Sequence, residues 1–136
     1  MSQQPIPIDD GEILYRRIPV SQEWYKDGIV YGEAFEPRIE ESSGISLFRK
    51  RFKTIEVVAR GKSKKGYYVA SLKVADIRAA GLAVVPQPDT ADGWDDSHVE
   101  IPNLNASIRR TNRAEELQSM LAEIAGRLPI VGPYVS

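Results

Sequence analysis

The fold is decided by residues 112–129, which read NRAEELQSMLAEIAGRLP. The apolar side chains in this stretch recur every three or four residues, so they share one face of an α-helix: Ala114, Leu117, Leu121, Ile124 and Leu128. Asn112, with Glu115 three residues later, resembles a capping box and predicts the helix start. Pro129 predicts the end, because proline cannot continue a helix. We therefore expect a long C-terminal helix with one buried face.

Residues 67–74 read YYVASLKV and predict a strand, because they alternate and are rich in β-forming residues. Bounded apolar stretches predict further strands at 12–18, 29–35, 44–48, 82–85 and 98–101. Helical spacing predicts shorter helices at 52–60, closed by Gly61, and at 76–80. This order is too irregular for a doubly wound sheet. We predict an α+β fold, a single compact domain with a mixed or antiparallel sheet, two to three helices and a long C-terminal helix.

Length and composition predict one domain of the cell interior. The 136 residues fall within the usual size of a single domain. Residues 1–11 lack the basic and apolar regions of a secretory signal, and they predict a flexible arm before the domain at 12–136. The apolar runs are far shorter than the roughly 20 residues that a membrane-spanning helix needs. We expect a cytoplasmic protein without a membrane partner.

The composition excludes several kinds of chemistry. The chain has no cysteine, which excludes disulfides, thiolate catalysis and cysteine-bound metal. His98 is the only histidine, so a zinc site built from several histidines is excluded as well. Residues 61–63 resemble the end of a phosphate-binding loop, but Glu56 stands where that motif needs a glycine. We therefore predict no metal site and no cofactor, and we interpret His98 as a structural histidine at a sheet end.

Charge is segregated along the chain although the net charge is only -1. Residues 49–65 contain eight basic residues against Glu56, whereas residues 87–100 contain five acidic residues and no lysine or arginine. A basic surface binds phosphate backbones, which makes the following residues candidates for nucleic-acid binding: Arg49, Lys50, Arg51, Lys62, Lys64 and Lys65. The alternative, which the near-zero net charge favours, is a solvated segment whose charges partly face the acidic loop.

Two further segments are candidates for binding. Arg109, Arg110 and Arg113 lie at the start of the C-terminal helix, where cations oppose the helix dipole. They either tolerate that small cost or mark a site for an anionic partner. Residues 129–136 carry no charged side chain, so we expect this tail to dock on its own domain or on a partner.

Several short motifs resemble those of a group of small bacterial proteins. The motifs lie between Leu14 and Leu104 and are the following: Leu14-Tyr15-Arg16-Arg17-Ile18, Ala34-Phe35 with Pro37, Ile45-Ser46, Val69-Ala70-Ser71-Leu72, Gly81-Leu82, and His98 with Ile101. This resemblance implies a bacterial origin and no particular reaction.

A fainter resemblance links the chain to ADP-ribosyltransferase-like domains, which use an arginine on an early strand, a serine on a middle strand and a late glutamate. The matching residues are Arg16 or Arg17, then Ser46 and Glu100. The resemblance implies that the arginine holds cofactor phosphates and the serine positions the nicotinamide ribose. The glutamate would then stabilise the positive charge that develops in the transition state.

Taken together, these patterns favour a non-enzymatic bacterial interaction protein, an accessory or immunity-type subunit that binds a protein partner. One alternative is a nucleic-acid-binding module that uses the basic segment at residues 49–65. The other is a transferase-like enzyme that uses Arg16, Ser46 and Glu100. The sequence leaves the oligomeric state open.

Overall fold

The computed structural model describes residues 4–38, 40–61, 64–108 and 110–133. At its centre is a five-stranded antiparallel sheet in the order β5-β1-β4-β9-β6. Its strands are β1 (Ile13–Pro19), β4 (Ile45–Arg49), β5 (Tyr67–Lys73), β6 (Val85–Pro86) and β9 (His98–Ile101). The helices are α1 (Ile55–Arg60), α2 (Val74–Ala79) and α3 (Asn112–Ala125), with 3-10 turns η1 (Gly32–Phe35) and η2 (Ala106–Ile108). Two small hairpins pair β2 (Tyr25–Lys26) with β3 (Ile29–Val30), and β7 (Asp89–Thr90) with β8 (Gly93–Trp94).

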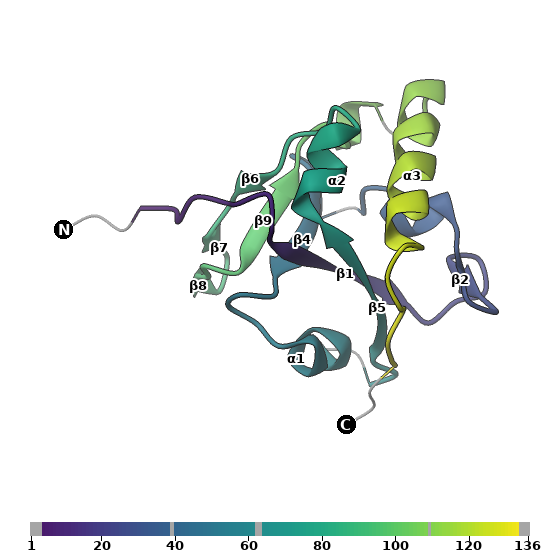
Figure 1. Ribbon diagram of the computed structural model, residues 1–136, viewed down its shortest axis with the longest axis horizontal. Helices are drawn as coiled ribbons and strands as arrows, with labels where there is room; N and C mark the ends of the chain where they lie inside the picture. Colours follow the sequence, from purple (N-terminus) through teal and green to yellow (C-terminus); the bar gives the residue numbers. More distant parts are fainter. Residues whose placement is uncertain (1–3, 39, 62–63, 109, 134–136) are drawn as a thin grey trace.

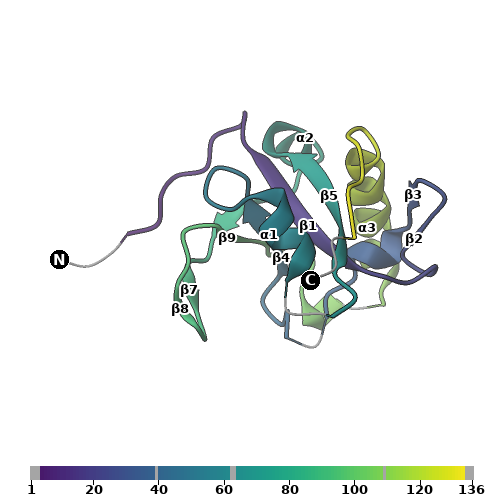
Figure 2. The same cartoon turned by 90° about the horizontal axis from the view of Figure 1, so that it is seen from below.

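The α+β class and the long C-terminal helix are therefore as predicted, and the sheet is antiparallel. Helices α2 and α3 lie on one face of the sheet, and α1 lies on the other (Figures 1 and 2). No helix among the described residues is both long and apolar enough to cross a membrane.

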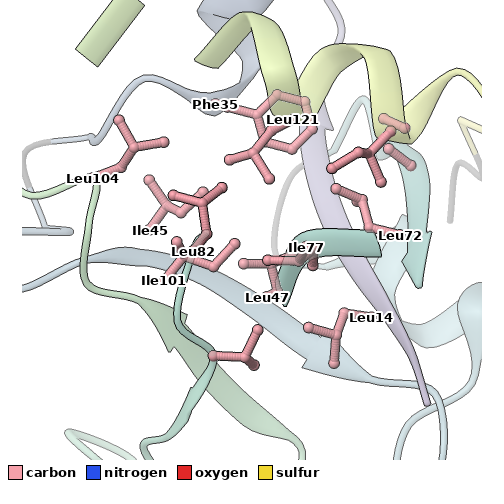
Figure 3. Packing of buried hydrophobic residues seen from close by; sticks show 14 of the residues in the cluster. Leu14, Phe35, Ile45, Leu47, Leu72, Ile77, Leu82, Ile101, Leu104 and Leu121 are labelled. Carbon is pink, nitrogen blue, oxygen red and sulfur yellow. The ribbon is translucent and has the colours of Figure 1, made fainter. Parts of the chain in front are cut away.

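The main core lies between the sheet and the layer formed by α2, α3 and η1. Leu14, Leu47 and Leu72 come from three neighbouring strands and are fully buried. Figure 3 shows these side chains beneath Phe35 of η1 and Leu121 of α3. Because successive side chains on a strand point to opposite faces, the residues between these core positions lie on the other face of the sheet.

The other face carries a smaller apolar cluster under α1. Val58 and Ala59 of α1 are fully buried against Tyr15 of β1 and Val69 of β5. Helix α1 is short, so this cluster covers only part of the face. Polar side chains from β4 and β9 share the same face beside it.

Several predicted boundaries are wrong in detail. Residues 29–35 do not form one strand, because the chain turns after Val30 into the 3-10 helix η1. Helix α3 begins one residue earlier than the capping-box prediction, since the Thr111 hydroxyl, not Asn112, accepts a hydrogen bond from the backbone N–H of Ala114 at 3.2 Å. It also ends at Ala125, before Pro129 can act.

The shorter elements differ from prediction for similar local reasons. Helix α1 starts at Ile55, because Thr54 caps its first turn by accepting from the N–H of Val57. Of the predicted strand at 82–85, only Val85 belongs to a strand, which is β6. The acidic loop, residues 87–100, contains the β7–β8 hairpin. These changes shift boundaries without changing the architecture.

Candidate functional site

The sheet face that carries α1 holds a pocket of about 210 Å³. Its walls include Arg17, Arg38, Ser46, Phe48, Tyr67 and His98, above a floor formed by Arg16 and Glu41, with Glu40 at its edge. Four strands and the loop before β4 supply these groups. Three arginines against two glutamates leave one net positive charge in the lining, so we consider it a candidate site for an anionic group.

The strand register explains why these residues meet. In the antiparallel pairing of β4 with β9, Ser46 lies opposite Glu100 and Phe48 lies opposite His98. Successive side chains on a strand point to opposite faces, so all four share the α1 face. Arg17 of β1 points to this face as well and contacts the Phe48 ring. His98 and Glu100 therefore lie on one face of β9, two residues apart.

Arg16 and Glu41 form a buried ion pair beneath the pocket. Arg16 Nη1 lies 2.5 Å from Glu41 Oε2, and Arg16 also donates to the backbone carbonyls of Ala34 and Ser46. Glu41 in turn accepts from the backbone N–H groups of Ser46 and Arg38. Arg16 is only 1% exposed, so its guanidinium is committed to holding the loop before β4.

The pKa of Glu41 reflects the same contacts. Burial alone would raise the pKa of this carboxyl, because it penalises the charged form. The nearby positive charge of Arg16 and the hydrogen bonds from Arg16, Ser46 and Arg38 outweigh the burial and hold the pKa below its ordinary value of 4.5. Glu41 is therefore an anion at neutral pH, and Arg16 already neutralises its charge.

Arg17 differs from Arg16 because its terminal nitrogens are not engaged. Its Nε donates to the Val58 carbonyl at 2.8 Å, and its guanidinium carbon lies 4.5 Å from the centre of the Phe48 ring. Within the described part of the chain, neither Nη atom has a hydrogen-bond acceptor. Burial lowers the pKa of Arg17, partly offset by Tyr67 and Asp95. Arg17 is thus a half-buried cation whose two Nη groups are available as hydrogen-bond donors.

Arg38 is the second half-buried cation of the pocket. Its Nη2 donates to the Arg17 carbonyl at 2.8 Å, and its guanidinium lies 5.5 Å from the centre of the Trp24 ring. Burial, together with the nearby charge of Arg16, lowers its pKa to about 10. Arg38 therefore stays charged at neutral pH, but an anion beside it would relieve the cost of its burial.

Ser46 and His98 are joined by a hydrogen bond that fixes the imidazole tautomer. His98 Nδ1 lies 2.6 Å from the carbonyl oxygen of Gln87, which only accepts, so Nδ1 carries a hydrogen. In the neutral ring Nε2 then has a lone pair and accepts from the Ser46 hydroxyl at 3.0 Å. His98 is thus a hydrogen-bonded sheet histidine, as interpreted from the sequence, and it also lines the pocket.

The residues of the transferase resemblance lie close together, with one difference. Ser46 and Glu100 are cross-strand neighbours on the α1 face, and the Glu100 carboxylate accepts from the Ser43 hydroxyl at 2.9 Å. The guanidinium of Arg16 is taken up by Glu41 and backbone carbonyls, whereas the Nη atoms of Arg17 have no acceptor among the described residues.

The basic segment is not one continuous surface. Arg49 is fully buried, where it binds the Glu12 carboxylate at 2.7 Å and the backbone carbonyls of Ile6 and Pro7. Lys53 pairs with Asp95 of the acidic loop at 3.1 Å. Among the other candidates, Lys50, Arg51, Lys64 and Lys65 are exposed, and Lys62 lies outside the described residues. The acidic loop therefore neutralises part of this segment.

The second arginine cluster is tied to neighbouring acids. Arg110 lies 3.7 Å from Glu36, and Arg113 pairs with Glu116 of α3 at 3.2 Å. Arg109 lies outside the described residues. A larger hollow of about 490 Å³ lies beside Arg110, but three glutamates line it, so it does not favour an anion.

The C-terminal tail docks on its own domain as far as it is described. Val131 exchanges two backbone hydrogen bonds with Val69 of β5, at 2.8 and 3.1 Å. Figure 1 shows this segment, in yellow, running from α3 alongside β5. Tyr134, Val135 and Ser136 lie outside the described residues. Of the two docking alternatives, these contacts favour the chain's own domain.

Comparisons with protein-family models, curated proteins and solved structures give no match. The two resemblances inferred from the sequence therefore remain predictions.

Sequence reasoning overlooked Arg38 and Tyr67 as pocket residues. Tyr67 carried a usable signal, because it starts the most regular strand and alternation places it on the face of Val69. Gly61 marks the same place, because a side chain there would collide with the Tyr67 ring. Arg38 carried no such signal, since its position depends on the loop that Arg16 and Glu41 hold.

Proposed function

We propose that this chain is a non-enzymatic bacterial interaction protein, an accessory or immunity-type subunit. It binds a protein partner by taking a negatively charged group of that partner into the basic pocket. The observation that carries this proposal is the pair of half-buried cations, Arg17 and Arg38, which line the same pocket and keep hydrogen-bond donors without a partner among the described residues.

The electrostatics of the pocket support an anionic group over a neutral one. Both arginines are partly desolvated, which lowers their pKa values. A hydrogen bond to a charged group contributes more than a neutral one, about 1.5–3 kcal/mol. Truncating either partner of such a charged pair at an interface is costly, because the other charge is left unpaired. The pocket is therefore the place where single substitutions should affect partner binding most.

A comparison of captured proteins tests the proposal. Tagged wild-type chain, the double variant Arg17→Gln/Arg38→Gln and the control Arg51→Gln are each used to purify partners from the host. The control removes the same kind of charge from an exposed arginine outside the pocket. We expect one partner to bind the wild type and the control, with at least about ten-fold less on the double variant. Circular dichroism checks that the variants are folded, and equal capture by all three would refute the proposal.

A transferase-like enzyme is the second candidate, because Arg17, Ser46 and Glu100 share one face of the sheet. Removing one electrostatic group that stabilises a transition state commonly lowers the rate about 100-fold or more. For such an enzyme, labelled NAD incubated with host lysate would transfer its label through the wild type and not through Glu100→Gln. We expect no transfer from either protein. Transfer that the substitution abolishes would replace the leading proposal with this one.

A further inference from the structure

The pocket residues that have unused hydrogen-bond donors come from three different parts of the fold. Arg17 supplies its two Nη atoms from β1, and Arg38 supplies Nε and Nη1 from the loop before β4. Tyr67 lines the pocket from β5, and within the described residues its hydroxyl has no hydrogen-bond partner. A planar carboxylate is bound well by one guanidinium fork, whereas donors on several sides suit a tetrahedral group with three terminal oxygens.

The fourth side of the pocket is formed by Ser46 and His98, and its character depends on one proton. When His98 is neutral, its Nε2 accepts a hydrogen bond from the Ser46 hydroxyl. The serine oxygen then offers only lone pairs to the pocket. With protonated His98, Nε2–H donates to the serine oxygen instead. The hydroxyl hydrogen is then free to point at a bound anion, so the proton converts this side from an acceptor to a donor.

We infer that the pocket binds a phosphate monoester of the partner and that binding is accompanied by uptake of one proton at His98. This inference rests on the proposed function and names the charged group. The dianion fits because it has three acceptor oxygens for the donors of Arg17, Arg38 and Ser46. Histidine is the side chain that most commonly gains or loses a proton near neutral pH, which makes His98 the candidate for the proton uptake.

Other charged groups lie near His98. Glu100 lies two residues along β9 on the same face, and Asp95 lies in the turn before that strand. Arg17 and Lys53 each lie over the ring of Phe48, the cross-strand neighbour of His98. The bound dianion adds negative charge beside the ring, and this addition drives the proton uptake.

Sulfate is the first probe, because its charge does not change across the range in which histidine titrates. The full chain is titrated with sodium sulfate at about pH 5.5 and about pH 8, and amide NMR shifts report binding. We expect the wild type and Arg51→Gln to bind roughly ten-fold more tightly at the lower pH. His98→Gln should remove most of this pH dependence. Arg17→Gln should weaken sulfate binding about ten-fold or more at both pH values. Acetate, a planar anion, should bind more weakly than sulfate.

The source of the phosphate is tested with the captured partner. Inorganic phosphate and phosphoserine are added as competitors, and a parallel sample of the lysate is treated with phosphatase. Loss of capture after phosphatase assigns the group to a phosphorylated protein. Competition by free phosphate with capture that survives phosphatase assigns the pocket to a free phosphorylated small molecule and overturns the partner-borne phosphate.

The two levels of the proposal fail differently. If partner capture depends on Arg17 and Arg38 but sulfate and phosphate do not bind, the phosphate inference is wrong and the interaction proposal stands. If His98→Gln keeps the full pH dependence of sulfate binding, the inferred proton uptake at His98 is wrong and the interaction proposal again stands. If capture does not depend on the two arginines, the interaction proposal itself is wrong, whatever sulfate does.

Discussion

Glu41→Gln should lower the free energy of unfolding by about 3–5 kcal/mol, because it leaves the buried charge of Arg16 without a counter-ion. Both side chains are almost fully buried, at 1% and 4% exposure, so water cannot replace the lost carboxylate. The substitution keeps the size of the side chain and some of its hydrogen bonds. Urea unfolding of the two proteins at neutral pH measures the difference.

The effect of pH provides a second test of this ion pair. The pKa of Glu41 is held below its ordinary value of 4.5 in the folded chain. Its contribution to stability is therefore complete above about pH 4.5 and is lost as the pH falls through the lowered folded value. The stability difference between wild type and Glu41→Gln should shrink in that acidic window. Glu40→Gln, which changes an exposed neighbour, should have little effect at either pH. An equally small effect of Glu41→Gln would show that the pair is not formed as described.

Leu121→Ala should cost about 2–5 kcal/mol of stability, because it leaves a cavity in the main core. Leu121 is fully buried in the cluster that contains Phe35, and Figure 3 shows both side chains among the packed residues of this core. Thermal and urea unfolding measure the loss. Glu116→Ala, an exposed substitution on the same helix, is the control. A cost below about 1 kcal/mol for Leu121→Ala would mean that this face of α3 is not buried.

The elements that the sequence predicted best are those with strong local periodicity. The stripe of α3 and the alternation of β5 reflect a single buried face each, and that pattern is visible without any knowledge of distant contacts. Boundaries were less predictable, because Thr111 and Asn112 are both good helix caps. The choice between them depends on how the preceding turn packs.

The pocket could be predicted only in part, since it depends on contacts between distant residues. Arg16 and Arg17 are neighbours with the same chemistry, but they point to opposite faces of the sheet. Arg16 forms the buried ion pair beneath the pocket, and Arg17 lies in the pocket wall. That distinction follows from the acid that meets Arg16, which is Glu41, 25 residues later in a loop. Nothing local in the sequence identifies this pairing. The pairing of two cations of the basic segment, Arg49 with Glu12 and Lys53 with Asp95, is likewise invisible to local sequence patterns.

The pairing of Val131 with Val69 has a consequence for how any partner can dock. An outer strand normally offers unpaired backbone groups to which another chain can add a strand. Here the tail already occupies part of that position on β5, and at the opposite side β6 is two residues long and ends in Pro86, which has no backbone N–H. Recruitment by strand addition is therefore disfavoured at both sides of the sheet. A partner of the proposed kind would therefore recognise side chains rather than a free strand edge, and the proposal assigns that role to the basic pocket.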